Sequence, residues 1–355
     1  MDASSLSLEM LGWSAERESE FAKWRAEKLE PGRVVIEDKQ NYTLFTRLGV
    51  LEGRASGQLL QAARSQAELP KVGDWVAVEP RPDHKKALIR YVLPRTTKLA
   101  RKVLGRPSEE QVLATNVDVA FLVQSFDQGL NQRVLERMLL SVREAGIKPV
   151  VVLNKCDLSR TVEEVLAQAR NSAGDAPVLA VSARTGKNAR HLLDHIKPGQ
   201  TGVLLGASGV GKSSLINRLY GEEVATVTPV RDSDAKGRHT TTWRELIVLP
   251  QGALIIDTPG LRQFQLWVAG EGLQETFPEI FELAAGCKFR DCRHEAETGC
   301  AVKAALEAGR LSVERYQNFL KVRREIEALE QARLKRQWKP AGRPKRERIL
   351  EDSDE

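Results

Sequence analysis

The spacing of apolar residues divides the chain into segments of different predicted structure. Up to residue 30, single aromatic and leucine side chains stand among alternating Glu, Arg and Lys, which predicts a helical N-terminal extension over residues 1–30. Between Arg33 and Leu99, short apolar runs such as GQLLQAA at residues 57–63 are separated by Gly, Pro, Asp and Asn. This punctuation predicts about five strands in a small closed β-barrel over residues 31–100. The pattern fits an OB-fold and an SH3-like barrel nearly equally well.

Apolar strands alternate with helical segments, among them residues 188–195, from Asn116 onward. Such alternation predicts a largely parallel sheet with helices on both faces, and we place this α/β domain at residues 105–268. Beyond it the strand pattern ends, and a mostly helical, cysteine-bearing domain is predicted over residues 269–335. Residues 336–355 combine Pro, Gly and charge, first basic and then acidic, which is typical of a disordered tail. The chain is therefore expected to be multidomain.

Composition narrows the functional classes only slightly. The chain has 355 residues, of which 41% are hydrophobic and 29% charged, and its net charge of +6 favours a polyanionic partner. The N-terminus carries Asp2 and Glu9 and lacks the basic start and apolar core of a signal peptide. No apolar run approaches the length of about 20 residues that spans a membrane. We therefore expect a cytoplasmic protein with no membrane partner.

The residues GASGVGKS match the phosphate-binding pattern G-x-x-x-x-G-K-[ST], with a predicted strand before them and a helix after them. The glycines turn backbone N–H groups toward phosphate oxygens, and the helix N-terminus adds its positive dipole end. Lys212 would reach the β- and γ-phosphates, and the hydroxyl of Ser213 would bind Mg²⁺. The expected nucleotide contacts in this loop are Gly206, Ala207, Ser208, Gly209, Val210, Gly211, Lys212, Ser213 and Ser214.

A second set of predicted phosphate and magnesium contacts follows the phosphate loop. Asp257 ends an apolar strand and begins the pattern D-x-x-G, so it would hold Mg²⁺ through water while the N–H of Gly260 contacts the γ-phosphate. Between the two motifs lie Thr240, Thr241 and Thr242. One of these hydroxyls could complete the Mg²⁺ shell, and Thr241 is favoured with little to separate it from its neighbours. The run could also simply begin a strand.

Two short motifs indicate that the base is guanine. Asn154, Lys155 and Asp157 form the pattern N-K-x-D after a buried strand. A carboxylate at Asp157 can accept both donors of guanine, N1–H and the 2-amino group, whereas adenine leaves that buried acceptor unpaired. Lys155 would lie along the base and Asn154 would hold the loop. After the next strand, Ser182 and Ala183 begin the S-A-[KR] loop that meets the base from its other side.

The order of these motifs is unusual, because the base-reading motifs precede the phosphate loop. This is the usual GTPase order cut once and rejoined. Ligand-binding loops leave the carboxyl ends of the strands whatever the connectivity, so a parallel sheet tolerates the change. The order predicts a circularly permuted GTPase.

The cysteines point to a separate metal site. Cys287, Cys292, His294 and Cys300 form C-x4-C-x-H-x5-C. Three thiolates and one imidazole complete a tetrahedral zinc site with no open position, so the predicted zinc is structural. Cys156 is distant in sequence and is interpreted as the variable residue of the base-reading motif.

Taken together, the motifs NKCD, VSARTG, GASGVGKSS, GRHTTT and DTPG, with CKFRDCRHEAETGC after them, resemble the ribosome small-subunit-dependent GTPase A family over roughly residues 10–335. The resemblance implies an N-terminal OB-fold, a central circularly permuted P-loop GTPase and a C-terminal zinc domain. It also implies GTP hydrolysis stimulated by the 30S subunit and its 16S rRNA during late maturation. We expect GTP or GDP with Mg²⁺ and one Zn²⁺ as ligands, no DNA partner, and a monomer.

The catalytic water has no obvious ligand directly after D-x-x-G, where many GTPases have glutamine. Leu261 occupies that place, so slow intrinsic turnover is predicted. Gln263 is displaced by two positions, and the resemblance favours His239 as the residue that positions water. A loop histidine that contacts RNA is the alternative. The expected catalytic residues are His239, Lys212 and Thr241.

RNA contacts are less specific in the sequence. The barrel aromatics either stack on bases or pack the core, and basic residues near the barrel and in the last helix either contact phosphates or form a solvated face. The aromatic residues are Tyr42, Phe45, Trp75 and Tyr91, and the basic ones are Arg95, Lys98, Arg101, Lys102, Arg323, Arg324, Arg333, Lys335 and Arg336. A non-enzymatic RNA-binding scaffold and a GTPase acting on tRNA or a membrane protein are the alternative functions. The intact Mg²⁺ motifs argue against the scaffold.

Overall fold

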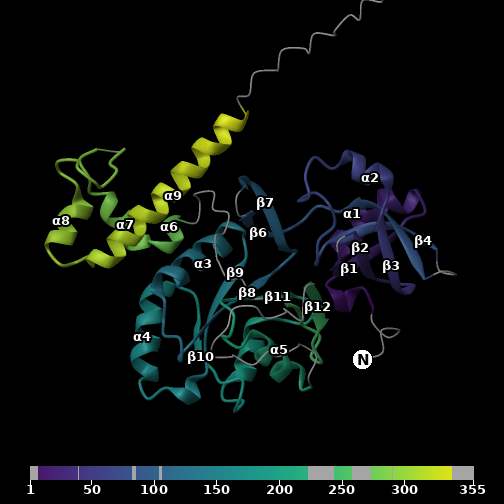
Figure 1. Cartoon of the computed structure of the whole chain (residues 1–355), viewed down its shortest axis with the longest axis horizontal. Coiled ribbons are helices and arrows are strands. Elements are labelled where there is room, and N and C mark those ends of the chain that lie inside the picture. Colours follow the sequence, from purple (N-terminus) through teal and green to yellow (C-terminus); the bar gives the residue numbers. More distant parts are fainter. Residues whose placement is uncertain are drawn as a thin grey trace, which may run out of the picture.

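A computed structural model describes residues 7–38, 40–81, 85–103, 106–222, 244–257, 273–289 and 291–337. A barrel, an α/β region and a helical region follow one another along the chain, and the barrel and the helical region lie on different sides of the α/β region (Figure 1). The predicted tail from residue 338 onward lies outside the described residues. Within the described part of the chain, no helix is both long and apolar enough to cross a membrane.

The N-terminal region is a closed five-stranded barrel preceded by η2 (Glu9–Leu11) and α1 (Ala15–Ala26). Its strands pair in the order β1-β2-β3-β5-β4, and β4 pairs with β1 to close it. The strands are β1 (Glu30–Asp38), β2 (Asn41–Thr46), β3 (Gly49–Ala55), β4 (Trp75–Arg81) and β5 (Lys86–Val92). Tyr42 and Trp75 are buried in the barrel region, whereas Tyr91 is exposed.

One predicted strand of the barrel is a helix. GQLLQAA forms α2 (Gly57–Ala62), and the N-cap hydroxyl of Ser56 accepts a hydrogen bond from the N–H of Leu59. The segment has an N-cap residue and no β-branched side chain, which favours a helix over a strand. The expected number of strands is nevertheless correct, because the apolar run after Asn41 contains both β2 and β3.

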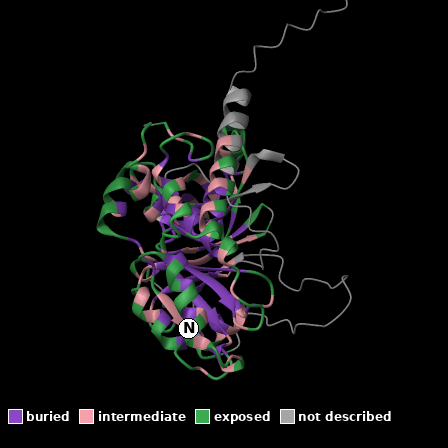
Figure 2. Ribbon diagram, turned by 90° about the vertical axis from the view of Figure 1, so that its left-hand side faces the viewer, coloured by how far each residue is buried: buried purple, intermediate pink, exposed green. Residues whose placement is uncertain are grey.

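The α/β region contains six strands in the order β10-β9-β8-β11-β13-β12. The first five are parallel and β12 is antiparallel to β13. Helices α3 and α4 pack on one face, and α5 and the 3₁₀ helix η5 pack on the other, so the sheet is buried from both sides (Figure 2). The bounds are β8 (Val119–Ser125), α3 (Gln132–Glu144), β9 (Lys148–Asn154), η4 (Cys156–Leu158), α4 (Val162–Ala173), β10 (Val178–Ala180), η5 (Ala189–His195), β11 (Thr201–Leu205), α5 (Lys212–Tyr220), β12 (Arg244–Val248) and β13 (Leu254–Asp257).

The C-terminal region is helical and docks on α3. It consists of α6 (Leu273–Thr276), α7 (Pro278–Ala284), α8 (Ala301–Glu307) and α9 (Val313–Gln337). Leu140 of α3 joins its apolar core, which includes Phe277 and Phe319. Arg315 of α9 forms ion pairs with Glu136 of α3 and with Glu279. An apolar contact and a buried charge pair therefore hold this region against the α/β region.

The barrel and the α/β region share one continuous sheet of eleven strands. Strand β1 pairs antiparallel with β12, with Ile36 opposite Glu245 and Glu37 opposite Arg244. The connection between the two regions forms a separate hairpin, β6 (Lys98–Val103) and β7 (Arg106–Thr115). The predicted architecture, with a barrel, an α/β region and a helical region that carries the cysteine cluster, is confirmed.

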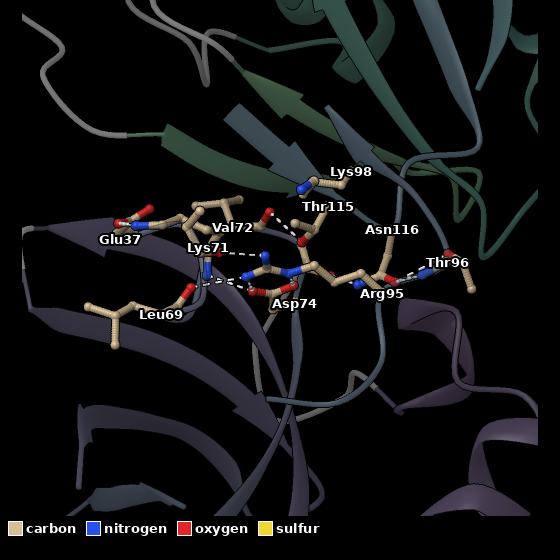
Figure 3. Close-up of polar contacts among 12 residues, drawn as sticks. Glu37, Leu69, Lys71, Val72, Asp74, Arg95, Thr96, Lys98, Thr115 and Asn116 are labelled. Carbon is tan, nitrogen blue, oxygen red and sulfur yellow. Dashed lines mark hydrogen bonds and ion pairs between the residues drawn. The ribbon is translucent and has the colours of Figure 1, made fainter. Parts of the chain in front are cut away.

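A buried polar cluster locks the joint between barrel and α/β region (Figure 3). Asn116 accepts hydrogen bonds from the Thr96 N–H and from Arg17, both at 3.0 Å, and donates one to the Gly73 carbonyl at 2.9 Å. A Cβ atom on Gly73 would lie 2.2 Å from the Thr115 carbonyl oxygen, so only glycine allows this close approach.

Arg95 belongs to the same joint. Its guanidinium forms two hydrogen bonds with the buried Asp74 carboxylate, at 2.8 and 2.7 Å, and also donates to the carbonyls of Ala67 and Leu69. Lys98 is paired with Glu110. Arg95 therefore holds a barrel loop in place. Its guanidinium is engaged within the protein, so the predicted phosphate contacts would have to come from the other basic residues. The side chains of Arg101, Lys102, Arg333, Lys335 and Arg336 lie outside the described ones.

Replacing Asn116 by alanine is expected to destabilise the chain by about 3 kcal/mol, because buried partners lose their hydrogen bonds and alanine disfavours a positive φ. The φ of Asn116 is 52°. The urea midpoint and slope of unfolding measure the change. Asn171→Ala, at an exposed position of α4, is the control and should shift the free energy of unfolding by less than about 0.5 kcal/mol. Equal stabilities of the two variants would contradict the role of Asn116.

Candidate functional site

The phosphate-loop motif lies between the ends of three neighbouring strands. It follows β11 and leads into α5, which begins at Lys212. A Cβ atom on Gly206 would lie 2.2 Å from the Val123 carbonyl oxygen, and one on Gly211 would lie 2.3 Å from the Asn154 amide nitrogen. Both glycines of the motif are thus required by the close approach of the loop to β8 and to the end of β9.

Lys212 and Asp257 face the same end of the sheet. The ammonium of Lys212 is buried and donates to the carbonyls of Gly206 and Ala207, both at 2.9 Å. Burial lowers the pKa of Lys212 to about 8, and the charge of Asp257 opposes this effect. Burial likewise raises the pKa of Asp257, opposed by Lys212. A cation and a carboxylate therefore lie near the phosphate loop in surroundings poor in water.

Asn154 joins the phosphate loop to the second base-reading motif. Its side chain is buried, and its amide donates to the Val210 carbonyl at 2.8 Å. Its carbonyl oxygen accepts a hydrogen bond from the Ala183 N–H at 3.0 Å. One side chain thus fixes the spacing between Val210 and Ala183, which are 27 residues apart in the sequence.

Lys155 adds a third connection. Its φ is 63°, and its ammonium donates to the Gly209 carbonyl at 2.7 Å and to Asp127 at 2.6 Å. Gln128, beside Asp127, donates to the Ser208 carbonyl at 3.4 Å. The loop after β8 therefore lies against the phosphate loop. The sequence analysis did not identify Asp127 and Gln128. They follow β8, which lies beside β11 in the sheet, so their loop emerges next to the phosphate loop that follows β11.

The two carboxylate oxygens of Asp157 lie in different surroundings. A hydrogen bond from Ser182 holds the pKa of Asp157 below its usual range, with a further contribution from Arg184. Its Oδ2 lies 3.0 Å from Arg184. Its Oδ1 is buried and has no hydrogen-bond partner among the described residues. An ionised carboxylate with an unused buried acceptor fits the two donors on the edge of guanine. Cys156 beside it is buried and does not belong to the group of the other three cysteines and His294.

The four predicted zinc ligands come together. Their ligand atoms all lie within 4.8 Å of one another. The Nδ1 atom of His294 lies 3.6 Å from the Cys287 sulfur and 3.5 Å from the Cys300 sulfur, and these two sulfurs are 3.9 Å apart. Tetrahedral zinc with ordinary bond lengths requires sulfur–nitrogen and sulfur–sulfur separations of about 3.6 and 3.8 Å. This Cys₃His cluster is therefore compatible with zinc, and Nδ1 is the nitrogen that faces the site.

Several predicted site residues lie outside the described part of the chain. These are His239, the threonines Thr240, Thr241 and Thr242, Gly260, Leu261 and Gln263. Their predicted roles remain those inferred from the sequence. The described residues of the phosphate loop, the base-reading motifs and Asp257 all lie at the carboxyl ends of strands.

The arrangement defines a circularly permuted P-loop GTPase fold, because the strands of both base-reading motifs precede the phosphate strand in the chain yet lie in the same sheet. The family model "RsgA GTPase" matches residues 92–267. "Small ribosomal subunit biogenesis GTPase RsgA" of Opitutus terrae is 44% identical over 329 residues, which cover 90% of each chain. The protein of that name from Streptomyces avermitilis is 41% identical over 96% of this chain and 93% of its own.

Two solved structures have a fold similar to that of this chain. YjeQ from Thermotoga maritima has a TM-score of 0.62 and 25% identity, covering 84% of this chain and 98% of its own. YloQ, described as a circularly permuted GTPase, has a TM-score of 0.58 and 26% identity, covering 84% of this chain and 96% of its own. The chain belongs to the RsgA GTPase family, whose members are hydrolases of GTP. The family implies a guanine nucleotide and Mg²⁺, and the resemblance seen in the sequence is confirmed.

Proposed function

We propose that this chain hydrolyses GTP and uses the nucleotide state to control its docking on the 30S ribosomal subunit during late maturation. The observation that carries the GTPase part is a buried oxygen of Asp157 that has no hydrogen-bond partner in the described part of the chain, in a loop that Asn154 ties to the phosphate loop. The subunit part rests on the relatives, which are named as small ribosomal subunit biogenesis GTPases.

The proposed roles of the domains and the proposed partner are those predicted from the sequence. The barrel, residues 31–100, is the proposed RNA-binding domain, residues 105–268 the GTPase domain and residues 269–335 the zinc domain. The partner is the 16S rRNA of the subunit, with no DNA partner, and the protein acts in the cytoplasm as a monomer.

The nucleotide is proposed to bind along one edge of the sheet. Asp157 accepts hydrogen bonds from N1–H and the 2-amino group, Lys155 lies along the base, and Ser182 and Ala183 close its other side. Backbone N–H groups of Gly206 to Ser214 surround the phosphates at the N-terminus of α5, where the helix dipole favours negative charge. Lys212 exchanges its two carbonyl partners for phosphate oxygens.

Magnesium would be held by Ser213, Asp257 through water, and Thr241 or a neighbouring threonine, and when bound it neutralises charge that develops on the phosphates. Gly260 contacts the γ-phosphate, and Lys212 stabilises the transition state. His239 is the proposed residue that orients the attacking water. Since the side chain of Leu261 offers no hydrogen bond after D-x-x-G, intrinsic turnover is slow, and the 30S partner raises it.

One structural zinc ion is proposed at the Cys₃His cluster, held by Cys287, Cys292, His294 and Cys300. Four protein ligands close its coordination shell, so the ion supplies stability and no catalytic water.

GTP turnover with and without purified 30S subunits tests the function. We expect slow hydrolysis alone and a large stimulation by subunits, and His239→Ala should bind GTP normally but lose the stimulated rate. His191→Ala, at an exposed position of η5, is the matched control. A flat response to subunits would remove the ribosomal part and leave the GTPase part standing. Full stimulated turnover in His239→Ala would exclude that residue from catalysis.

Replacing Asp157 by asparagine should exchange guanine for xanthine as the preferred base. The asparagine amide can donate to the 2-carbonyl of xanthine and accept from its N1–H, whereas the 2-amino group of guanine then faces another donor. Affinity for GDP should fall about a hundredfold while affinity for XDP rises. Titration with fluorescent nucleotides measures both. Asp175→Asn, an exposed change outside the site, should leave GDP affinity unaltered, and unchanged base preference in Asp157→Asn would contradict the assignment.

Metal analysis of the purified chain tests the zinc site. Wild type and Cys156→Ser should contain one zinc ion per chain, and Cys292→Ser should lose it and unfold at lower temperature because the fourth ligand is missing. Cys156→Ser controls for the loss of a thiol elsewhere in the chain. Stoichiometric zinc in Cys292→Ser, or none in wild type, would refute the site.

A further inference from the structure

An arginine on the phosphate-loop helix holds the loop that carries Ser182 and Ala183. Arg218 lies six residues after Lys212 on α5. Its Nε donates to the Ala183 carbonyl at 2.8 Å and its Nη2 donates to the Arg184 carbonyl at 2.6 Å. The rigid fork of a guanidinium is suited to two acceptors at this spacing, and a charged donor makes each bond stronger than a neutral one.

These two bonds orient the peptide planes of the loop. In a planar trans peptide, the C=O of one residue and the N–H of the next point in opposite directions. Because the Ala183 carbonyl points toward Arg218, the N–H of Arg184 points away from it. Because the Arg184 carbonyl also points toward Arg218, the Thr185 N–H points away as well, and it donates to the Ser182 hydroxyl at 3.1 Å. Arg218 thus fixes which side of the loop presents carbonyls and which presents donors.

Ala183 is consequently held from both sides. Its N–H donates to Asn154, whose amide also binds the phosphate loop at Val210. Its carbonyl accepts from Arg218, which the helix α5 connects rigidly to Lys212 and Ser213. The turn beyond it also lies against the guanidinium, since a Cβ atom on Gly186 would lie 3.6 Å from Nη1 of Arg218. The distance between the phosphate loop and this loop is therefore fixed twice, once by Asn154 and once by Arg218.

We propose that Arg218 is a positioning residue for guanine-nucleotide binding, and this inference rests on the proposed function. It does not contact the nucleotide. It presets the separation and orientation of the base-contacting loop relative to the phosphate loop, so that one rigid ligand can occupy both. Loss of this preset arrangement lowers the affinity for every nucleotide that contacts both loops, whatever its number of phosphates.

A purely stabilising role makes a different prediction. Arg218 is exposed. If its side chain only stabilised the fold, its replacement would lower the unfolding temperature, and nucleotide affinity would change no more than after replacement of another exposed arginine. The reading of the 2-amino group belongs to Asp157, so a change at Arg218 should leave the affinity ratio of inosine to guanine nucleotides intact. This combination of effects is specific to a positioning role.

The test compares wild type, Arg218→Met, Arg218→Lys and the matched control Arg170→Met, an exposed arginine of α4. Affinities for GDP, GTP and IDP are measured by fluorescence titration, and the unfolding temperature is measured without nucleotide. Arg218→Met should weaken GDP and GTP alike by about tenfold, with an unchanged ratio of IDP to GDP affinity. The nucleotide affinity of Arg218→Lys should lie between those of wild type and Arg218→Met, because a lysine ammonium keeps the charge but lacks the fork of the guanidinium. Arg170→Met should stay within about twofold of wild type.

An affinity of Arg218→Met within twofold of wild type, or an equal loss in Arg170→Met, overturns the inference. If Arg218→Met does not fold, Arg218→Lys decides, and unchanged affinity there overturns it as well. If wild type binds guanine nucleotides and the Arg218 variants bind them with the same affinity, the positioning role is contradicted and the proposed function stands. Wild type that binds adenine nucleotides as tightly as guanine nucleotides contradicts the proposed function itself.

Discussion

The nucleotide site depends on how closely the backbone of the phosphate loop approaches the strands beside it. Gly206 lies directly against the Val123 carbonyl of β8, and Gly211 against the side chain of Asn154 at the end of β9. Because nothing larger than a hydrogen atom fits at either point, the loop, the base-reading motif and the neighbouring strand form one packed unit. The hydrogen bonds of Asn154 and Lys155 follow from that closeness, since both side chains are within reach of loop carbonyls. Cutting and rejoining the chain elsewhere leaves this unit unchanged, which explains how a permuted order preserves the same site.

Local motifs were predictable because the chemistry of phosphate, guanine or zinc requires particular residues at short fixed spacings. The cysteine cluster is an example, since four ligands within 14 residues can surround one ion without help from the rest of the fold. Contacts between distant segments were not predictable. Arg95 carried the same charge in the sequence as any RNA-binding arginine, and only the approach of Asp74 decides its role. Arg218 is likewise an ordinary helix residue until the loop at Ala183 is placed beside it. The helix α2 was missed because two leucines between Gly and Ala suit a short strand as well as a helical turn.

The three regions are attached to one another by different physical means. The barrel is joined by backbone pairing and by a buried hydrogen-bond network around Asn116, in which Arg17 is a charged donor. The helical region is joined to α3 by Arg315, which spans Glu136 and Glu279, together with an apolar contact at Leu140. Helix α3 also begins directly after the loop of Asp127 and Gln128 that touches the phosphate loop. One helix therefore connects the nucleotide site at its start with the helical region along its length.

The pairing of β1 with β12 also determines which sheet edges meet solvent. Without the barrel, β12 would be the last strand of the GTPase sheet and would present unpaired N–H and C=O groups along its length. Such an edge is a template for pairing with other chains and hence for aggregation. At the opposite edge, β10 has only three residues, too few to offer a long template. The barrel therefore covers part of the edge of the catalytic sheet, where Ile36 and Glu37 of β1 lie opposite β12.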